Sequence, residues 1–284
     1  MAQILILGAA GMLGRDLQRE TERRGIETSP MDVAECDVTK PADCERTLEA
    51  IRPEIVINCA AWTNVASAEH HPEETFAINA EGAGNVARAC AHALCRCIYL
   101  STDFVFDGTK NAPYLETDAP NPVNTYGKSK LEGERRVSFS APNHAIIRTA
   151  WLYGQHGPNF VRSILALRHG QRPVEVVNDQ MGSPTWTRHL ARAILDIALS
   201  KETGIFHATN SGSCTRDEQA RLIFELAGTD PDLIHPAPTS PDAVPQRPAD
   251  SRLSCDRLSG LMAEPMPDWA TALEEFLTEI GQRK

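Results

Sequence analysis

The sequence predicts an α/β fold in which a doubly wound parallel sheet is followed by a smaller C-terminal lobe. Short apolar runs alternate with amphipathic helical patterns over the first 150 residues, as expected of parallel strands joined by crossover helices. The first apolar run leads directly into a string of glycines. Beyond Trp151, prolines become frequent and the periodic runs become shorter, which indicates a change of architecture.

Five strands and four helices are expected to alternate in the first 150 residues. The first strand is a short apolar run that ends at a glycine, a pattern typical of a strand buried on both faces. Helices are expected where apolar residues recur with helical spacing. The strands are predicted at Gln3–Leu7, Ile26–Met31, Ile55–Asn58, Cys97–Ser101 and Ala145–Thr149, and the helices at 11–24, 41–51, 76–94 and 125–137.

The chain is expected to divide near residue 150. Residues 1–150 would form a dinucleotide-binding domain, and residues 151–284 would form most of a substrate-binding lobe. We expect the chain to return to the first domain near residues 174–200, with a strand at Val174–Asn178 joining the sheet and a helix at Leu190–Leu199. The proline-rich stretch from Pro231 to Pro248 is interpreted as an ordered loop at the cleft.

Composition excludes several classes of protein. The 284 residues carry a net charge of −10, which argues against binding to nucleic acids or anionic membranes, because these need a basic face. No run of about 20 apolar residues and no signal peptide is evident, so we expect a cytoplasmic protein. The eight cysteines form no C-x-x-C pair or Cys/His cluster; we expect reduced, mostly buried thiols and no metal.

The glycine string Gly8–Gly14 has the form G-x-x-G-x-x-G and lies between a predicted strand and a predicted helix. Glycines there allow a tight turn and let a pyrophosphate approach the helix N-terminus. The sequence therefore predicts NADPH or NADH as cofactor. Asp32, at the end of the second strand, would accept hydrogen bonds from a ribose and favour NADH, whereas Arg15 would suit a 2′-phosphate. The choice stays open.

Tyr126 and Lys130 form a Y-x-x-x-K motif at the start of a predicted helix, and this spacing places both on one helical face. A nearby ammonium is expected to lower the pKa of the phenol, which is ordinarily about 10. Thr102 ends the fourth strand at the carboxyl edge of the sheet, where open α/β folds bind ligands. We therefore expect these three residues to form the catalytic set.

Several blocks of sequence resemble the extended short-chain dehydrogenases and, among them, the dTDP-4-dehydrorhamnose reductases. They extend over nearly the whole chain. The blocks are 58–63 (NCAAWT), 101–108 (STDFVFDG), 126–134 (YGKSKLEGE), 148–154 (RTAWLYG), 159–161 (NFV), 179–185 (DQMGSPT) and 247–248 (RP). Ala66 and Ser67 stand where that family usually has Asp, which is the clearest departure.

The resemblance implies a Rossmann-like fold, reduction of a 4-keto group on a dTDP-deoxyhexose, and a set of site residues. Catalysis is assigned to Thr102, Tyr126 and Lys130. Cofactor binding is assigned, together with Tyr126 and Lys130, to Gly8, Gly11, Met12, Leu13, Gly14, Asp32, Asp37, Val38, Asn58, Ala60, Ala61 and Asn79. Substrate binding is assigned, together with Thr102 and Tyr126, to Asp103, Phe104, Trp151, Asn159, Gln180 and Arg247, where Arg247 is our own candidate for the diphosphate because an acidic protein needs a specific fork of donors.

Phe104 favours simple reduction over dehydration. The related sugar-nucleotide 4,6-dehydratases have a glutamate at the corresponding place, and phenylalanine cannot carry a proton. Two alternatives stay open: a non-catalytic regulatory subunit that binds a dinucleotide, and a reductase or epimerase of another nucleotide sugar. Some relatives form metal-bridged dimers, but Arg188 stands where a second acidic ligand is expected beside Asp16, so we expect no metal and a monomer or homodimer.

Overall fold

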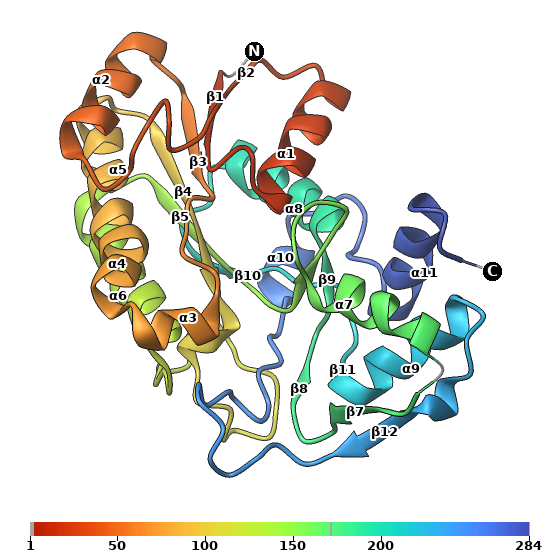
Figure 1. The fold of residues 1–284 in the computed structure, drawn as a ribbon. Helices are drawn as coiled ribbons and strands as arrows, with labels where there is room; N and C mark the ends of the chain where they lie inside the picture. Colours follow the sequence, from red (N-terminus) through yellow and green to blue (C-terminus); the bar gives the residue numbers. More distant parts are fainter. Residues whose placement is uncertain (1–2, 171, 284) are drawn as a thin grey trace.

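The computed structural model describes residues 3–170 and 172–283. Its centre is a six-stranded, fully parallel sheet in the order β2-β1-β3-β4-β5-β10 (Figure 1). The strands are β1 (Ile4–Leu7), β2 (Thr28–Met31), β3 (Ile55–Asn58), β4 (Arg96–Thr102), β5 (His144–Thr149) and β10 (Gly204–His207). The doubly wound sheet predicted from the sequence is confirmed, with five strands close to their expected positions.

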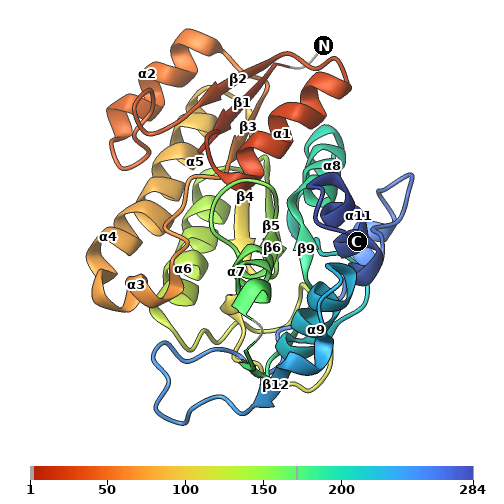
Figure 2. The same cartoon turned by 45° about the vertical axis from the view of Figure 1, so that its right-hand side comes forward.

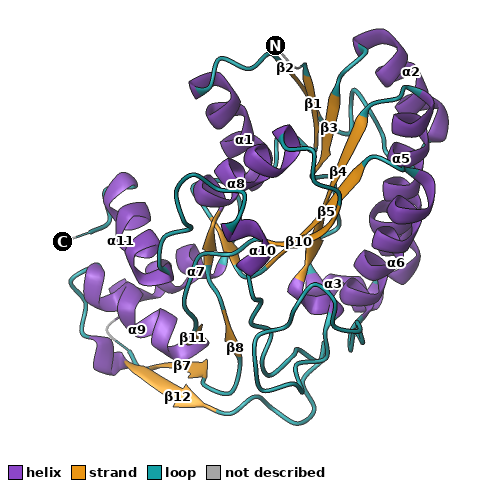
Figure 3. Ribbon diagram, turned by 180° about the vertical axis from the view of Figure 1, so that it is seen from behind, coloured by secondary structure: helices purple, strands orange, loops and turns teal. Residues whose placement is uncertain are grey.

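Helices cover both faces of this sheet because its strands are apolar on both faces. Ile4 and Ile6 pack on the side of α1 (Met12–Arg23) and α8 (Thr187–Leu199). Leu5 and Leu7 face the other side. That side is covered by α2 (Pro41–Ile51), α5 (Ala83–His92) and α6 (Thr125–Ser140). Figure 1 and the reverse view in Figure 3 show these two layers.

The winding direction of the chain reverses at β1. The chain passes from β1 outward to β2, then crosses back to β3 on the other side of β1. A crevice opens at such a switch point, beyond the carboxyl ends of the strands. The segments that follow Leu7, Asn58, Thr102 and Thr149 therefore converge on one edge of the sheet.

The third predicted helix, at 76–94, is interrupted. The segment consists of α4 (Pro72–Phe76), a π-helical turn over Ala77–Gly82 and α5, and α3 (Val65–His70) precedes it. Asn79 lies in the π-helical turn, where its buried amide accepts a hydrogen bond from Trp62 N and donates to Trp62 O and Ser129 Oγ. The turn thus holds the loop after β3, and π-helical turns are frequent at functional sites.

The C-terminal lobe has its own apolar core, formed by α7 (Phe160–Leu167), α9 (Arg216–Leu226) and α11 (Trp269–Glu279). Figure 2 shows α9 and α11 on the opposite side of the molecule from α2 and α6. Three two-stranded sheets complete the lobe. They pair β6 (Leu152–Tyr153) with β9 (Thr185–Trp186), β8 (Met181–Gly182) with β11 (Cys214–Thr215), and β7 (Val174–Val177) with β12 (Ile234–Ala237). A short helix, α10 (Asp256–Ser259), lies beside β10.

The strand predicted at Val174–Asn178 was assigned to the wrong sheet. A strand does form near Val174–Asn178, but β7 pairs with β12 in the lobe and does not join the central sheet. The sixth strand is β10 instead, which pairs with β5. The helix expected at Leu190–Leu199 is α8, and it packs on α1. The division at residue 150 stays a prediction.

The stretch from Pro231 to Pro248, expected to be a loop, forms a 3-10 turn and β12 in its first part. All eight cysteines are unpaired and six of them are buried. Within residues 3–170 and 172–283, no helix combines the length and apolar character needed to cross a bilayer.

Gly133 lets α6 pack closely on its neighbours. A Cβ at this position would lie 2.3 Å from both the carbonyl oxygen of Asn79 and the hydroxyl of Tyr99. We predict that Gly133→Ala lowers the free energy of unfolding by about 1–3 kcal/mol, because overpacking a close contact forces the backbone to shift. Urea unfolding measures this. Gly260→Ala is the matched control and should be nearly neutral, since its Cβ would meet nothing closer than 3.7 Å; equal losses in both variants would contradict the packing argument.

Candidate active site

A cavity of about 760 Å³ opens at the carboxyl ends of the central strands, between the sheet and the C-terminal lobe. Fourteen of the residues expected at the site line it. They are Gly8, Gly11, Met12, Leu13, Gly14, Ala61, Thr102, Asp103, Phe104, Tyr126, Lys130, Trp151, Asn159 and Arg247. The cavity therefore joins the glycine string, the three candidate catalytic residues and four segments of the substrate half.

The glycine string forms the tight turn that the motif predicts. Gly8 has φ 73°, and a Cβ at Gly14 would lie 2.4 Å from the carbonyl oxygen of Gly8. The turn leads into the N-terminus of α1, which has no side-chain cap. This cradle leaves backbone N–H groups for a pyrophosphate and fits a dinucleotide.

Asp32 lies on the other side of the glycine turn, outside the main cavity. It lines a separate hollow with Arg15 and Glu35. One carboxylate oxygen of Asp32 accepts a hydrogen bond from Ala10 N at 2.8 Å, and Arg15 Nε donates to Ala10 O at 3.0 Å. An acid and a base thus flank the place expected for the adenosine ribose, and the structure leaves both cofactors possible.

The remaining cofactor candidates are Asp37, Val38, Asn58, Ala60 and Asn79. Asn58 is buried and accepts a hydrogen bond from Ala60 N. Asp37 binds the hydroxyl and N–H of Thr39, and Val38 is buried in the core. Asn79 is fully buried and fixes the Trp62 backbone. None of these five residues lines the main cavity.

The three candidate catalytic groups come from two elements. Thr102 ends β4, and Tyr126 and Lys130 lie in the first two turns of α6. Asn124 caps this helix by accepting a hydrogen bond from Gly127 N at 2.8 Å. Lys130 is buried, with its Nζ 4.1 Å from the centre of the Tyr99 ring. All three groups line the cavity.

The pKa of Tyr126 differs from the expectation. Burial raises the pKa of this phenol above its ordinary value; contact with the Thr102 hydroxyl lowers it and the charge of Asp103 raises it further. Lys130 is not among the groups that act on it. Burial also lowers the pKa of Lys130 to about 7, against the attraction of Glu134. The expected lowering of the phenol pKa was therefore wrong for the cofactor-free protein, because loss of solvation is the largest effect on the phenol.

Asp103 is buried directly after Thr102. One of its oxygens accepts a hydrogen bond from the Thr102 hydroxyl at 3.0 Å, and the other has no partner among the described residues. Burial raises the pKa of Asp103 to about 6, although the nearby Ser251 and Thr102 hydroxyls oppose the shift. Phe104 packs edge-on against Tyr126, with ring centres 6.1 Å apart, so no proton-carrying group takes its place.

The substrate half of the cavity differs from the expectation at Gln180 and Arg216. Gln180 is buried and donates to the hydroxyl of Thr239 instead of reaching the cavity. Arg216 was not predicted, yet its guanidinium lies on the Trp151 ring, 3.4 Å from the ring centre. Its only sequence signal is a position at the start of a helix, which does not distinguish it from solvated arginines. Asn159 caps α7 and donates to Gly154 O.

Within the described parts of the chain, no group of three or more His, Cys, Asp or Glu side chains is placed to hold a metal ion. Asp16 accepts a hydrogen bond from Thr187, and Arg188 pairs with Glu279.

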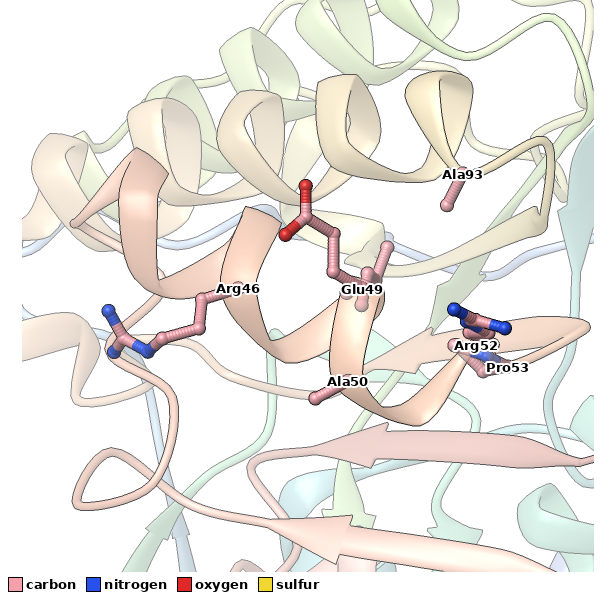
Figure 4. Close-up of a pocket in the computed structure, with 7 residues that line it drawn as sticks. Arg46, Glu49, Ala50, Arg52, Pro53 and Ala93 are labelled. Atoms are coloured by element: carbon pink, nitrogen blue, oxygen red, sulfur yellow. The ribbon is translucent and has the colours of Figure 1, made fainter.

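Another hollow lies apart from both the cavity and the hollow at Asp32. It is formed by α2, the turn that follows it and the end of α5 (Figure 4). Arg46, Glu49 and Arg52 line it, and Arg46 is paired with Asp43. It contains none of the predicted site residues.

Comparisons with known proteins agree with this geometry. The family model described as RmlD substrate binding domain matches residues 1–282. A dTDP-4-dehydrorhamnose reductase of Mycolicibacterium smegmatis is 40% identical over 99% of this chain and 86% of its own length. A dTDP-4-keto-6-deoxy-D-glucose reductase of Streptomyces niveus is 38% identical over 95% of both chains.

A solved structure is also similar over the whole chain. The dTDP-4-dehydrorhamnose reductase of Bacillus anthracis, crystallised in complex with NADP, superposes with a TM-score of 0.94 at 36% identity, covering 98% of this chain and 99% of that one. Because a family model and full-length relatives agree with the fold and with the motifs around the cavity, the chain belongs to the RmlD substrate-binding-domain family.

Proposed function

We propose that this protein is an NADPH- or NADH-dependent reductase that converts the C4 carbonyl of a dTDP-4-keto-6-deoxyhexose to a hydroxyl, as in the conversion of dTDP-4-dehydrorhamnose to dTDP-rhamnose. The observation that carries the proposal is the cavity itself, which Thr102, Tyr126, Lys130 and the glycine turn all line. The names of its relatives support the choice of substrate.

The chemistry needs one hydride and one proton. The reduced nicotinamide, when bound, supplies the hydride. Tyr126 supplies the proton to the carbonyl oxygen: its raised pKa keeps the phenol protonated at neutral pH, which is the state that a general acid requires. Thr102 holds the same oxygen through its hydroxyl.

Lys130 serves the cofactor end of the reaction. Its Nζ lies buried at the cavity wall and would bind the nicotinamide ribose. Once that ribose and the substrate exclude water, the ammonium acts on the phenol at lower dielectric and stabilises the phenolate left by proton donation. Asp103, Trp151 and Asn159 are proposed to contact the sugar, and Arg247 to bind the diphosphate.

The intact set of three groups favours an enzyme over a regulatory subunit, because a site without chemistry has no need for a phenol, an amine and a hydroxyl around one cavity. Oxidation of NADPH after addition of dTDP-4-keto-6-deoxyglucose and its 3,5-epimerase, which together provide the dTDP-4-keto-hexose, tests this directly. The cytoplasmic location and the monomeric or homodimeric state stay predictions.

We predict that Tyr126→Phe lowers kcat by about 10²–10⁴-fold, because a positioned proton donor contributes that much. Cofactor binding should change little, since the ring is kept. Stopped-flow NADPH oxidation and NADPH fluorescence titration measure the two quantities. Unchanged turnover would remove the proposed acid, and loss of cofactor binding would show that the variant disturbs the site.

The raised pKa of Asp103 predicts a stability difference that depends on pH. The ordinary pKa of 3.8 is raised to about 6 in the folded protein, so ionisation destabilises the fold as pH rises through this range. Asp103→Asn removes this cost, and its free energy of unfolding relative to the unmodified protein should increase by up to about 3 kcal/mol between pH 4 and pH 7. Urea unfolding at each pH measures it.

Asp107→Asn is a control without a slope in this pH range. Hydrogen bonds from Asn121 and Thr109 hold the pKa of Asp107 below its usual range, so the stability that this carboxylate contributes develops below about pH 4 and is nearly constant above it. The difference in free energy of unfolding between this variant and the unmodified protein should therefore change little between pH 4 and pH 7. The same slope in both variants would contradict the role of burial at Asp103.

A further inference from the structure

Arg216 and Arg247 bring two positive charges into the substrate half of the cavity. Both line it, Arg216 from the first residue of α9 and Arg247 from the loop after β12. Neither forms an ion pair with a carboxylate of the described residues, although the protein carries ten more acidic than basic charges. Repulsion from Arg247 lowers the pKa of Arg216, in addition to the larger effect of burial. The Asp103 carboxylate attracts Arg216 without forming an ion pair with it, so one acid faces two guanidinium groups and an excess of positive charge is left for an anion.

Arg216 is held in place by an aromatic platform. Its guanidinium carbon lies 3.4 Å from the centre of the Trp151 ring and 4.8 Å from that of Phe160. Its one hydrogen bond within the described chain runs from Nη1 to Gln219 Oε1 at 3.2 Å. Stacking fixes the plane of the guanidinium and leaves N–H groups for a ligand, which is the arrangement that suits a bidentate anion.

The platform itself is built at a backbone cost. Trp151 has φ 49°, a left-handed conformation that is rare for a bulky residue. Its indole lies against Gly182, where a Cβ would come 2.4 Å from the ring. Gly182 pairs with Cys214 across the β8–β11 ladder, two residues before Arg216. One short ladder therefore aligns the indole and the guanidinium, and strained backbone of this kind is concentrated at functional sites.

Arg247 is coupled to the catalytic helix. The side chain of Asn124 caps α6 through its oxygen and donates through its nitrogen to the Gln246 carbonyl at 2.9 Å. The loop that carries Arg247 is thus tied to the start of the helix that carries Tyr126. An anion bound by Arg247 would lie at a fixed distance from the reacting carbonyl.

From these contacts we infer that Arg216, stacked on Trp151, is a substrate-binding residue that holds the diphosphate of the nucleotide sugar together with Arg247. The inference rests on the proposed function and extends it, since it identifies which second residue recognises the charged part of the substrate. The two arginines would bind the phosphate oxygens from two sides, as a clamp. Trp151 would contact the sugar. The base of the nucleotide plays no part in this recognition.

Binding of thymidine, dTMP and dTDP tests the clamp without any requirement for turnover. Isothermal titration calorimetry would compare the unmodified protein with Arg216→Met, Arg216→Lys and Arg247→Met. Arg216→Met should weaken dTDP binding by about 10- to 100-fold, as expected for loss of hydrogen bonds between charged groups, weaken dTMP less and leave thymidine unchanged. Arg216→Lys keeps the charge but loses the planar fork of donors. Its affinity for dTDP should therefore lie between those of the unmodified protein and Arg216→Met.

Arg135→Met is the matched control, because this arginine of α6 is 69% exposed and lies outside the cavity. It should bind all three ligands as the unmodified protein does, and NADPH binding should be the same in every variant. In turnover, Arg216→Met should raise KM for the dTDP-4-keto-sugar by a similar factor while kcat changes little.

The possible outcomes separate the clamp from the function. If Arg216→Met binds dTDP normally, or loses thymidine and dTDP equally, Arg216 only supports Trp151 and the clamp is wrong. If the protein reduces the ketosugar but Arg216→Met leaves KM unchanged, the proposed function stands and the clamp is wrong. If dTDP binding depends on Arg216 but the protein reduces no ketosugar, the clamp stands and the proposed function is wrong. If the unmodified protein does not bind dTDP, both the clamp and the proposed function are wrong.

Discussion

The buried ion pair between Glu134 and Arg148 fixes the elements on which the site depends. Arg148 donates to both carboxylate oxygens of Glu134 at 2.9 and 2.7 Å, and the Ser101 hydroxyl donates to one of them at 2.5 Å. The three residues come from β5, α6 and β4. Loss of one partner would leave an uncompensated buried charge, which typically costs 3–5 kcal/mol. The pair therefore sets the height of the helix above the sheet.

The position of this pair explains why the candidate catalytic groups line one cavity. Thr102 follows Ser101, Lys130 lies one turn before Glu134 on α6, and Trp151 follows Arg148 by three residues. The contact of Gly133 with Asn79 and Tyr99 supports the same helix from the other side. The hydroxyl, the amine and the aromatic platform are thus placed by one network of short, buried contacts.

Much of this arrangement could be predicted from local sequence. The glycine turn, the apolar strands and the Tyr126–Lys130 spacing each depend on a few consecutive residues, and each was found where expected. The features that differed depend on residues far apart. β7 pairs with β12, which lies some 60 residues later in the chain. The π-helical turn binds the backbone of Trp62 in the loop after β3. The pairing of β11 with β8 places Arg216 at the cavity. The pKa of Tyr126 likewise follows from burial, which spacing along a helix cannot reveal.

The two halves of the cavity use different means of recognition, and their sequence signals differ for that reason. The cofactor half presents backbone N–H groups of a glycine turn, so only small residues in a fixed pattern can form it. The substrate half uses side chains from four separate segments, among them Trp151, Asn159, Arg216 and Arg247. Each of these can change without disturbing the sheet, because the lobe has its own core. Under the proposed function, a change of substrate within this fold would then require changes in those segments alone, while the candidate catalytic residues Thr102, Tyr126 and Lys130 would be retained.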